Sequence, residues 1–177
     1  MPAIQIVAFR GTGGVFDETS PYHNEPALIR AGHVAVAGVM PGALIGFSPS
    51  PDAVQIAGTE AALLEKLQRH IAQAGILQDD SSIFRRAAEL AEDGARCSVW
   101  QVTVNITDET LEQIKAWYNQ QKMARYNFPD DEGKFAAGEY NCATFWDQFD
   151  METPADTGSI KNYVRAMKLK GATQWHP

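Results

Sequence analysis

The sequence of 177 residues has only two cysteines, Cys97 and Cys142, and few basic side chains. Two cysteines cannot make the disulfide framework of a small secreted domain, so we expect free thiols in a protein made in the cytosol. The 15 Lys and Arg residues are outnumbered by 22 Asp and Glu residues, which gives a formal net charge of −7. This balance disfavours nucleic-acid binding and docking onto anionic membranes, because both need a basic surface.

Long apolar runs are also missing. The longest, residues 34–47, is interrupted by glycines and by Pro41, and it is shorter than the roughly 20 residues that cross a bilayer. The first residues, MPAIQIVAFRGTGG, lack the basic start, apolar run and cleavage site of a signal peptide. We therefore expect a cytoplasmic protein with no integral membrane association, and the sequence leaves delivery by a specialised secretion system open.

The length suits a single domain covering residues 1–177, and the 45% hydrophobic content is ordinary for a globular fold. Period-two alternation predicts strands and helical spacing predicts helices. The expected strands are 3–9, 31–39, 43–48 and 97–106, and the expected helices are 59–74, 107–122, 140–149 and 158–168, with 79–95 a less clear helix. This order predicts an α+β fold with a mainly antiparallel sheet packed against helices.

Cys142 is the residue with the clearest chemical potential. It lies in the first turn of the expected helix 140–149, where unpaired backbone amides and the helix dipole favour a thiolate and can hold an oxyanion. A thiolate also needs a base, and His33, on a strand between small residues, can project into a cleft. As residue types alone, the two also fit inert packing positions.

Two segments around these residues carry a resemblance. A strand with Gly32-His33-Val34-Ala35-Val36, and a later helix opening with Asn141-Cys142-Ala143-Thr144-Phe145, resemble the circularly permuted NlpC-like branch of the papain fold. This branch includes the lecithin:retinol acyltransferase-like and deSUMOylating-isopeptidase-like families, whose histidine precedes an Asn-Cys-x-x-Phe helix. The resemblance covers residues 30–50 and 125–150. It implies a permuted papain-like fold with Cys142 as a nucleophile at the start of a helix and His33 as its base.

A third catalytic residue is less clear, because the acyltransferase-like families carry a second histidine on the next strand and this sequence has none there. The turn Met40-Pro41-Gly42 places Ser48 opposite His33 if its first two residues are central, and Ser50 if its last two are. Ser48 is therefore a candidate to orient the imidazole. Alternatively Ser48 only begins the following proline-rich turn, and a dyad suffices.

Four more residues are candidates for the oxyanion hole or substrate binding. Asn141 is expected to cap the helix, or else its amide joins the oxyanion hole. The hydroxyls of Tyr140 and Tyr126 are placed to donate a hydrogen bond, or the rings only pack. Arg10 begins a glycine loop, residues 10–14, that lacks the Gly-Lys-Ser/Thr ending of a phosphate loop. That loop is expected to line a groove, with Arg10 a contact for a carboxylate or phosphate.

No cofactor or metal site is expected. The other histidines show no ligand spacing, and the two cysteines are far apart in the sequence, which argues against zinc. Cys97 begins an expected strand and is predicted to be buried and inert.

We therefore expect a cysteine hydrolase that cleaves an amide bond in a peptide, an isopeptide or a cell-wall stem peptide through a Cys142 thioester. A bacterial secreted effector would fit this description; the sequence identifies no inhibitor or immunity partner. One alternative is an acyltransferase or thioesterase acting on lipids with the same dyad, although a membrane-binding amphipathic helix is lacking. Another is a catalytically silent papain-like binding domain.

Overall fold

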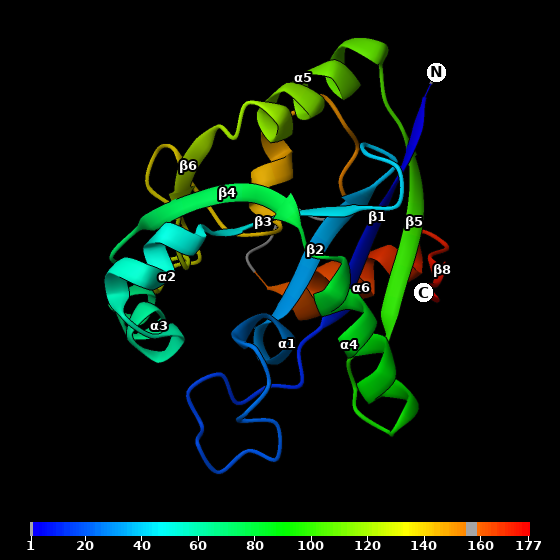
Figure 1. The fold of residues 1–177 in the computed structure, drawn as a ribbon. Helices are drawn as coiled ribbons and strands as arrows, with labels where there is room; N and C mark the ends of the chain where they lie inside the picture. Colours follow the sequence, from blue (N-terminus) through cyan, green and yellow to red (C-terminus); the bar gives the residue numbers. More distant parts are fainter. Residues whose placement is uncertain (1, 155–158) are drawn as a thin grey trace.

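The computed structural model describes residues 2–154 and 159–177, and its fold is α+β. The strands form one curled sheet of order β7-β6-β4-β3-β2-β1-β5-β8, in which β6 and β7 are parallel and the other neighbours antiparallel (Figure 1). The strands are β1 (Ala3–Arg10), β2 (Gly32–Ala37), β3 (Leu44–Pro49), β4 (Gln73–Asp79), β5 (Val99–Asn105), β6 (Met123–Tyr126), β7 (Glu139–Tyr140) and β8 (Thr173–Gln174). The α-helices are α1 (Ala27–Ala31), α2 (Pro51–Ala57), α3 (Glu60–Gln68), α4 (Ser81–Glu92), α5 (Asp108–Asn119) and α6 (Ile160–Leu169).

Strand β1 is an interior strand of the sheet, between β2 and β5, and is covered on both faces. Ile4 and Ile6 point into a core that also contains residues of α5 and α6, whereas Val7 and Phe9 point into a second core against α4. Burial on both faces explains why this strand reads as a nearly continuous apolar run. Figure 1 shows α4 in front of the sheet and α6 behind it.

Strands β2 and β3 form a hairpin that pairs only near its turn, and this partial pairing positions the candidate site. The ladder of paired residues runs from Ala37 opposite Leu44 to Ala35 opposite Gly46. Continued by two residues, its register puts Ser48 opposite the start of β2, which is the first of the two registers considered above. Beyond Ala35 no pairing of the two strands is seen among the described residues, and the side chains of His33, Ser48 and Asp80 lie in this region.

The turn itself differs from the one expected for this register. The amide of Ala43 donates to the carbonyl of Met40 at 3.2 Å, and Gly42 has a φ of +72°. Pro41 and Gly42 are therefore the central residues, a pair typical of a type II turn. A turn with these central residues would by itself put Ser50 opposite His33. The residues between the turn and the strands shift the pairing, so that the ladder has the register with Ser48 opposite His33.

The expected helix 59–74 is too long. Thr59 caps α3 as predicted, by accepting from the amide of Ala62 at 3.0 Å, but the helix ends at Gln68. His70 has a positive φ of 59°, a conformation that cannot continue a right-handed helix. The chain then enters β4, a strand that the sequence analysis missed.

The expected helix 140–149, with Cys142 in its first turn, is wrong. Tyr140 belongs to β7, Cys142 lies in a turn, and only a 3₁₀-helix, η1 (Thr144–Gln148), follows. The physical reason is that Tyr140 pairs with Tyr126 of β6, which keeps the chain extended up to that point. The helix-dipole argument for Cys142 is correspondingly weaker.

The helix expected at 158–168 is present as α6, although its expected first residue, Gly158, lies outside the described residues. The helices expected at 79–95 and 107–122 are also present, as α4 and α5. Within the described ranges, no helix combines the length and the apolar character that crossing a membrane requires.

Candidate active site

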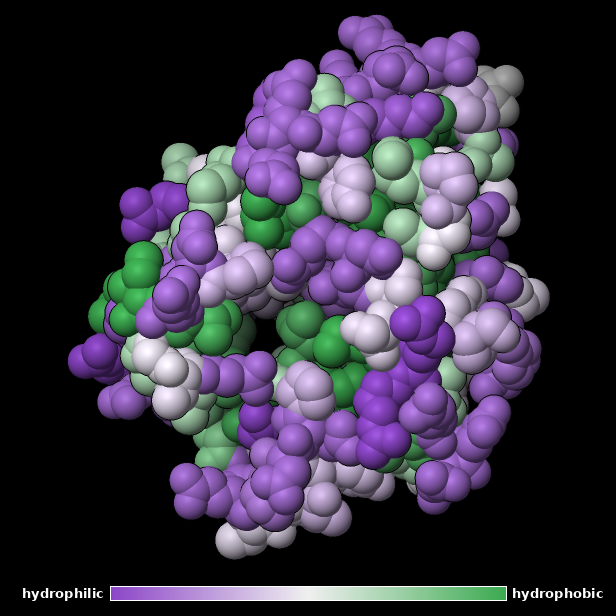
Figure 2. All heavy atoms as spheres, in the orientation of Figure 1, coloured by the Kyte–Doolittle hydropathy of each residue, from purple (hydrophilic) through white to green (hydrophobic). Residues whose placement is uncertain are grey.

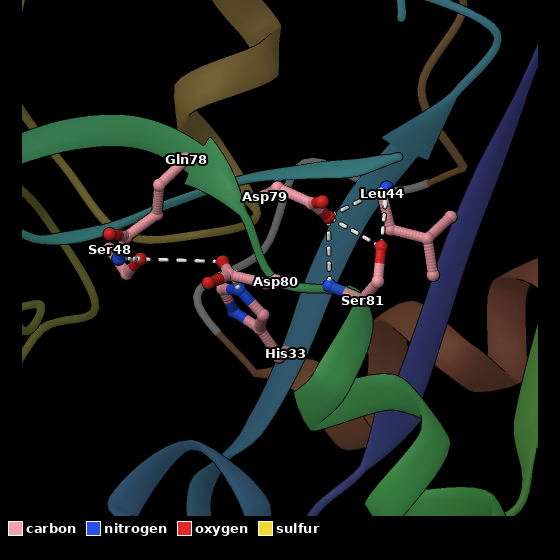
Figure 3. A network of polar contacts seen from close by, with 7 residues as sticks. All are labelled: His33, Leu44, Ser48, Gln78, Asp79, Asp80 and Ser81. Carbon is pink, nitrogen blue, oxygen red and sulfur yellow. Dashed lines mark hydrogen bonds and ion pairs between the residues drawn. The ribbon is translucent and has the colours of Figure 1, made fainter. Parts of the chain in front are cut away.

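The centre of the candidate site is a buried pair formed by His33 of β2 and Asp80. The imidazole is fully buried, and its Nε2 lies 2.7 Å from Oδ2 of Asp80 (Figure 3). Asp80 directly follows β4 and occupies the N-cap position of α4, yet its side chain makes no capping hydrogen bond. An aspartate at this position usually accepts from the helix backbone. Here the carboxylate turns to the histidine instead.

Two polar side chains on neighbouring strands form a hydrogen-bonded chain that ends on the carboxylate. Ser48 of β3 donates to Oδ2 of Asp80 at 3.4 Å, and Gln78 of β4 donates to Oγ of Ser48 at 2.7 Å (Figure 3). Ser48 therefore contacts Asp80 and not the imidazole. The expectation that Ser48 orients His33 is wrong. Asp80 is the residue hydrogen bonded to the imidazole, and Ser48 is hydrogen bonded to Asp80.

Gly46 of β3 makes room for the pair. A Cβ on Gly46 would lie 2.6 Å from both Nε2 of His33 and Oδ2 of Asp80, closer than real Cβ contacts allow. The imidazole is also held by the ring of Phe84, whose centroid is 5.6 Å away. Position 46 thus requires glycine for the histidine and the aspartate to meet above β3.

Cys142 lies beside the same imidazole. Burial by itself lowers the pKa of His33, but the hydrogen bond to Asp80 and the interactions with Cys142 outweigh it and raise this pKa to about 10. Nε2 is engaged by Asp80, and Nδ1 has no hydrogen bond of ordinary geometry among the described residues, so Nδ1 is the nitrogen left to face the thiol. Cys142, His33 and Asp80 thus converge from three distant segments of the chain.

The raised pKa of His33 makes stability depend on pH. A histidine whose pKa rises from 6.5 to about 10 on folding stabilises the protein fully below about pH 6.5, and the contribution is lost as the pH rises through about 10. We expect the free energy of unfolding, measured with urea, to fall by a few kcal/mol between pH 6.5 and 10. In His33→Gln this fall should largely disappear, and equal slopes in the two proteins would contradict the assignment.

Asn141 caps the turn that carries Cys142. Its Oδ1 accepts from the amides of Ala143 and Thr144, both at 2.9 Å, while the Thr144 hydroxyl accepts from the Asn141 amide at 2.9 Å. This reciprocal arrangement is a capping geometry. The amide of Cys142 itself has no acceptor among the described residues.

The two tyrosines and Arg10 lie at different distances from this centre. Tyr126 is buried, and burial, followed by the nearby charges of Cys142 and Asp80, raises its pKa well above the usual value. Its hydroxyl has no hydrogen-bond partner in the described part of the chain. Tyr140 packs edge-on against Phe145. Arg10 ends β1 and makes no side-chain hydrogen bond or ion pair with any described residue, and its role as a contact for a carboxylate or phosphate stays a prediction.

A cavity of about 220 Å³ opens near the pair, between the helices α1, α2 and α3 and the ends of strands β3, β4 and β6. Ser48, Gln78 and Tyr126 form its wall toward Asp80 and Cys142. Figure 2 shows a hollow left of the centre, bordered by hydrophobic side chains, where Figure 1 has these helices. Cys142, His33 and Asp80 do not themselves line the cavity, which borders the site through Ser48, Gln78 and Tyr126.

Asp80, Gly46 and Gln78 are the site residues that the sequence analysis missed. An acidic residue directly after a strand and before a helix is a recognisable signal for a site. The sequence pattern does not predict a strand at residues 73–79, so the position of Asp80 between a strand and a helix cannot be recognised from it. In the part of the chain that the structure describes, no cluster of three or more His, Cys, Asp or Glu side chains is arranged to hold a metal.

Comparison of the chain with protein-family models, with characterised proteins and with solved structures finds no match.

Proposed function

We propose that the protein is a cysteine hydrolase that cleaves an amide bond, with Cys142 as nucleophile, His33 as general base and acid, and Asp80 as the residue that orients His33. The observation that carries this proposal is the buried hydrogen bond of 2.7 Å between His33 and Asp80, with Cys142 beside the same ring. A protonated imidazole next to a thiol stabilises the thiolate, which is the nucleophilic form. The order of histidine strand and later cysteine turn fits the permuted papain-like arrangement.

The reaction would proceed in two halves. The Cys142 thiolate adds to the carbonyl carbon, and the imidazolium of His33 then donates its proton to the leaving nitrogen as the carbon–nitrogen bond breaks. The product is a free amine and a thioester on Cys142. His33, now neutral, takes a proton from water as the water oxygen attacks the thioester. The carbon–sulfur bond breaks, and a carboxylic acid is released.

As donors to the oxyanion we propose the backbone amide of Cys142 and the hydroxyl of Tyr126, whose pKa is raised by burial and by the nearby Cys142. We expect Tyr126→Phe to lower amide turnover by about 10- to 100-fold, somewhat less than the loss of a full oxyanion donor elsewhere. The rate at which iodoacetamide alkylates Cys142 should stay within about twofold, because that reaction forms no oxyanion. Equal losses in both rates would instead indicate a purely structural role for the ring.

The proposal is tested by trapping the acyl-enzyme. Wild type and Cys142→Ala are incubated with three substrate pools: linear peptides, lysine isopeptides and cell-wall stem peptides. Rapid acid quenching followed by peptide mapping should find an acyl group on Cys142, and new amines should form only with wild type. Amine release that is unchanged in Cys142→Ala would overturn the proposal, and no turnover in any pool would favour a binding domain.

A further inference from the structure

We infer that the cavity beside the candidate site is a specificity pocket for one apolar group of the substrate, of about the size of a phenyl or short aliphatic side chain. The inference rests on the proposed function and adds the class of substrate. It concerns the cavity of about 220 Å³ between α1, α2, α3 and the ends of strands β3, β4 and β6.

The position of the cavity ties it to the reacting groups. Ser48 and Gln78 line it and also form the hydrogen-bonded chain that ends on Asp80, at 2.7 Å and 3.4 Å. Tyr126 lines the same space and lies near both Cys142 and Asp80. A group held in the cavity would therefore fix the rest of the substrate against the thiol.

The lining decides the chemistry of the occupant. The walls are mainly aliphatic and aromatic side chains, among them Leu63, Leu64, Leu67, Val54 and Phe128. Among the described residues that line the cavity, Glu60 is the one with a formal charge.

Glu60 is already engaged by the protein. Its Oε1 accepts from the amide of Ala27 at 2.9 Å and lies 3.6 Å from Arg30. The ion pair with Arg30 partly compensates the charge of Glu60, so a charged substrate group finds little to pair with in this lining and an apolar group gains most from the pocket.

The volume limits the size of the occupant. An engineered apolar cavity of about 150 Å³ accommodates benzene. The present cavity, at about 220 Å³, is roughly one and a half times as large. It fits a benzyl or hexyl group, whereas the long chain of a membrane lipid exceeds it.

The test measures alkylation of Cys142 by iodoacetamides that differ in the group on the amide nitrogen: hydrogen, benzyl, hexyl and dodecyl. Each second-order rate constant is divided by that of glutathione with the same reagent, which removes differences in intrinsic reactivity. We expect the benzyl and hexyl reagents to react at least tenfold faster than iodoacetamide with wild type. The dodecyl reagent should show no further gain over hexyl.

Val54→Trp should abolish this preference, because a ring on α2 would fill the cavity. Ile56→Trp is the matched control, since Ile56 is on the same helix, is 80% exposed and does not line the cavity. The control should keep the wild-type preference. If Val54→Trp proves unstable, Leu28→Trp, which fills the cavity from α1, replaces it.

The outcomes separate the pocket from the proposed function. If Cys142 reacts rapidly with iodoacetamide but shows no preference for benzyl or hexyl, the pocket is refuted and the catalytic site stands. A rate that continues to rise with dodecyl would overturn the size limit and indicate an acyl chain from a lipid. A preference that survives Val54→Trp and Leu28→Trp, both with unchanged iodoacetamide rates, would place the apolar site elsewhere and refute the pocket.

Discussion

Replacement of Asp80 by alanine is expected to lower turnover at Cys142 by about 10²- to 10⁴-fold, the range that a positioned acid–base group contributes. The carboxylate is hydrogen bonded to His33 at 2.7 Å and both residues are buried, so the loss of Asp80 leaves Nε2 without this acceptor and the ring held mainly by packing against Phe84. Asp80→Asn should recover part of the activity, because the amide oxygen still accepts from Nε2. The turnover rate of a substrate identified by acyl-enzyme trapping, compared between wild type, Asp80→Ala and Asp80→Asn, measures both the loss and the partial recovery.

Ser48→Ala is the matched control for this prediction. Its hydrogen bond to Asp80 is long, at 3.4 Å, and such a bond contributes about 1 kcal/mol, which corresponds to a loss of roughly fivefold. A loss in Ser48→Ala as large as that in Asp80→Ala would contradict the order of contacts described here. It would restore Ser48 as the residue that orients the imidazole.

Gly46→Ala is expected to abolish turnover and to destabilise the fold by about 1–3 kcal/mol, the usual cost of overpacking. The added Cβ would lie 2.6 Å from both His33 and Asp80, so the two side chains would have to move apart. Gly46 has no positive φ, so backbone strain does not contribute to the expected effect. Urea unfolding and substrate turnover measure the two consequences separately.

A double-mutant cycle identifies the cause of that loss. In a protein that already carries His33→Ala and Asp80→Ala, the Cβ has space, and Gly46→Ala should cost less than about 1 kcal/mol. An undiminished cost in this background would show that the alanine collides with something else. A stable and fully active Gly46→Ala protein would refute the geometry of the pair.

Much of the frame could be predicted from local patterns. The alternation of side chains in β2 and the spacing of Leu111, Ile114 and Trp117 in α5 follow from burial on one or two faces of each element. Such burial leaves a periodic pattern of apolar residues in the sequence. The histidine strand and the later cysteine were visible as a motif. Their proximity in space depended on the fold, and the structure brings the two side chains together.

The missed features depend on contacts that are distant in sequence. Residues 73–79 contain Gly75, and glycine is depleted in strands. This position needs glycine because the ring of Phe47 packs where a Cβ would lie. Without β4, Asp80 could not be placed beside His33, which is 47 positions away. The chain around Cys142 is extended up to Tyr140 because of its pairing with β6, and no periodicity within 140–149 reports that pairing.

The most direct test of the central claim is the pH dependence of iodoacetamide alkylation, mapped by mass spectrometry to each cysteine in wild type and His33→Ala. Cys97 is the internal control, since burial raises the pKa of its thiol and no histidine is among the causes. We predict that at pH 6 Cys142 reacts at least tenfold faster than glutathione, an ordinary thiol with a pKa of about 8.5, and that His33→Ala removes this advantage. If Cys142 reacts no faster than glutathione, or equally fast without His33, the thiol and the imidazole do not act together and the proposed activity is contradicted.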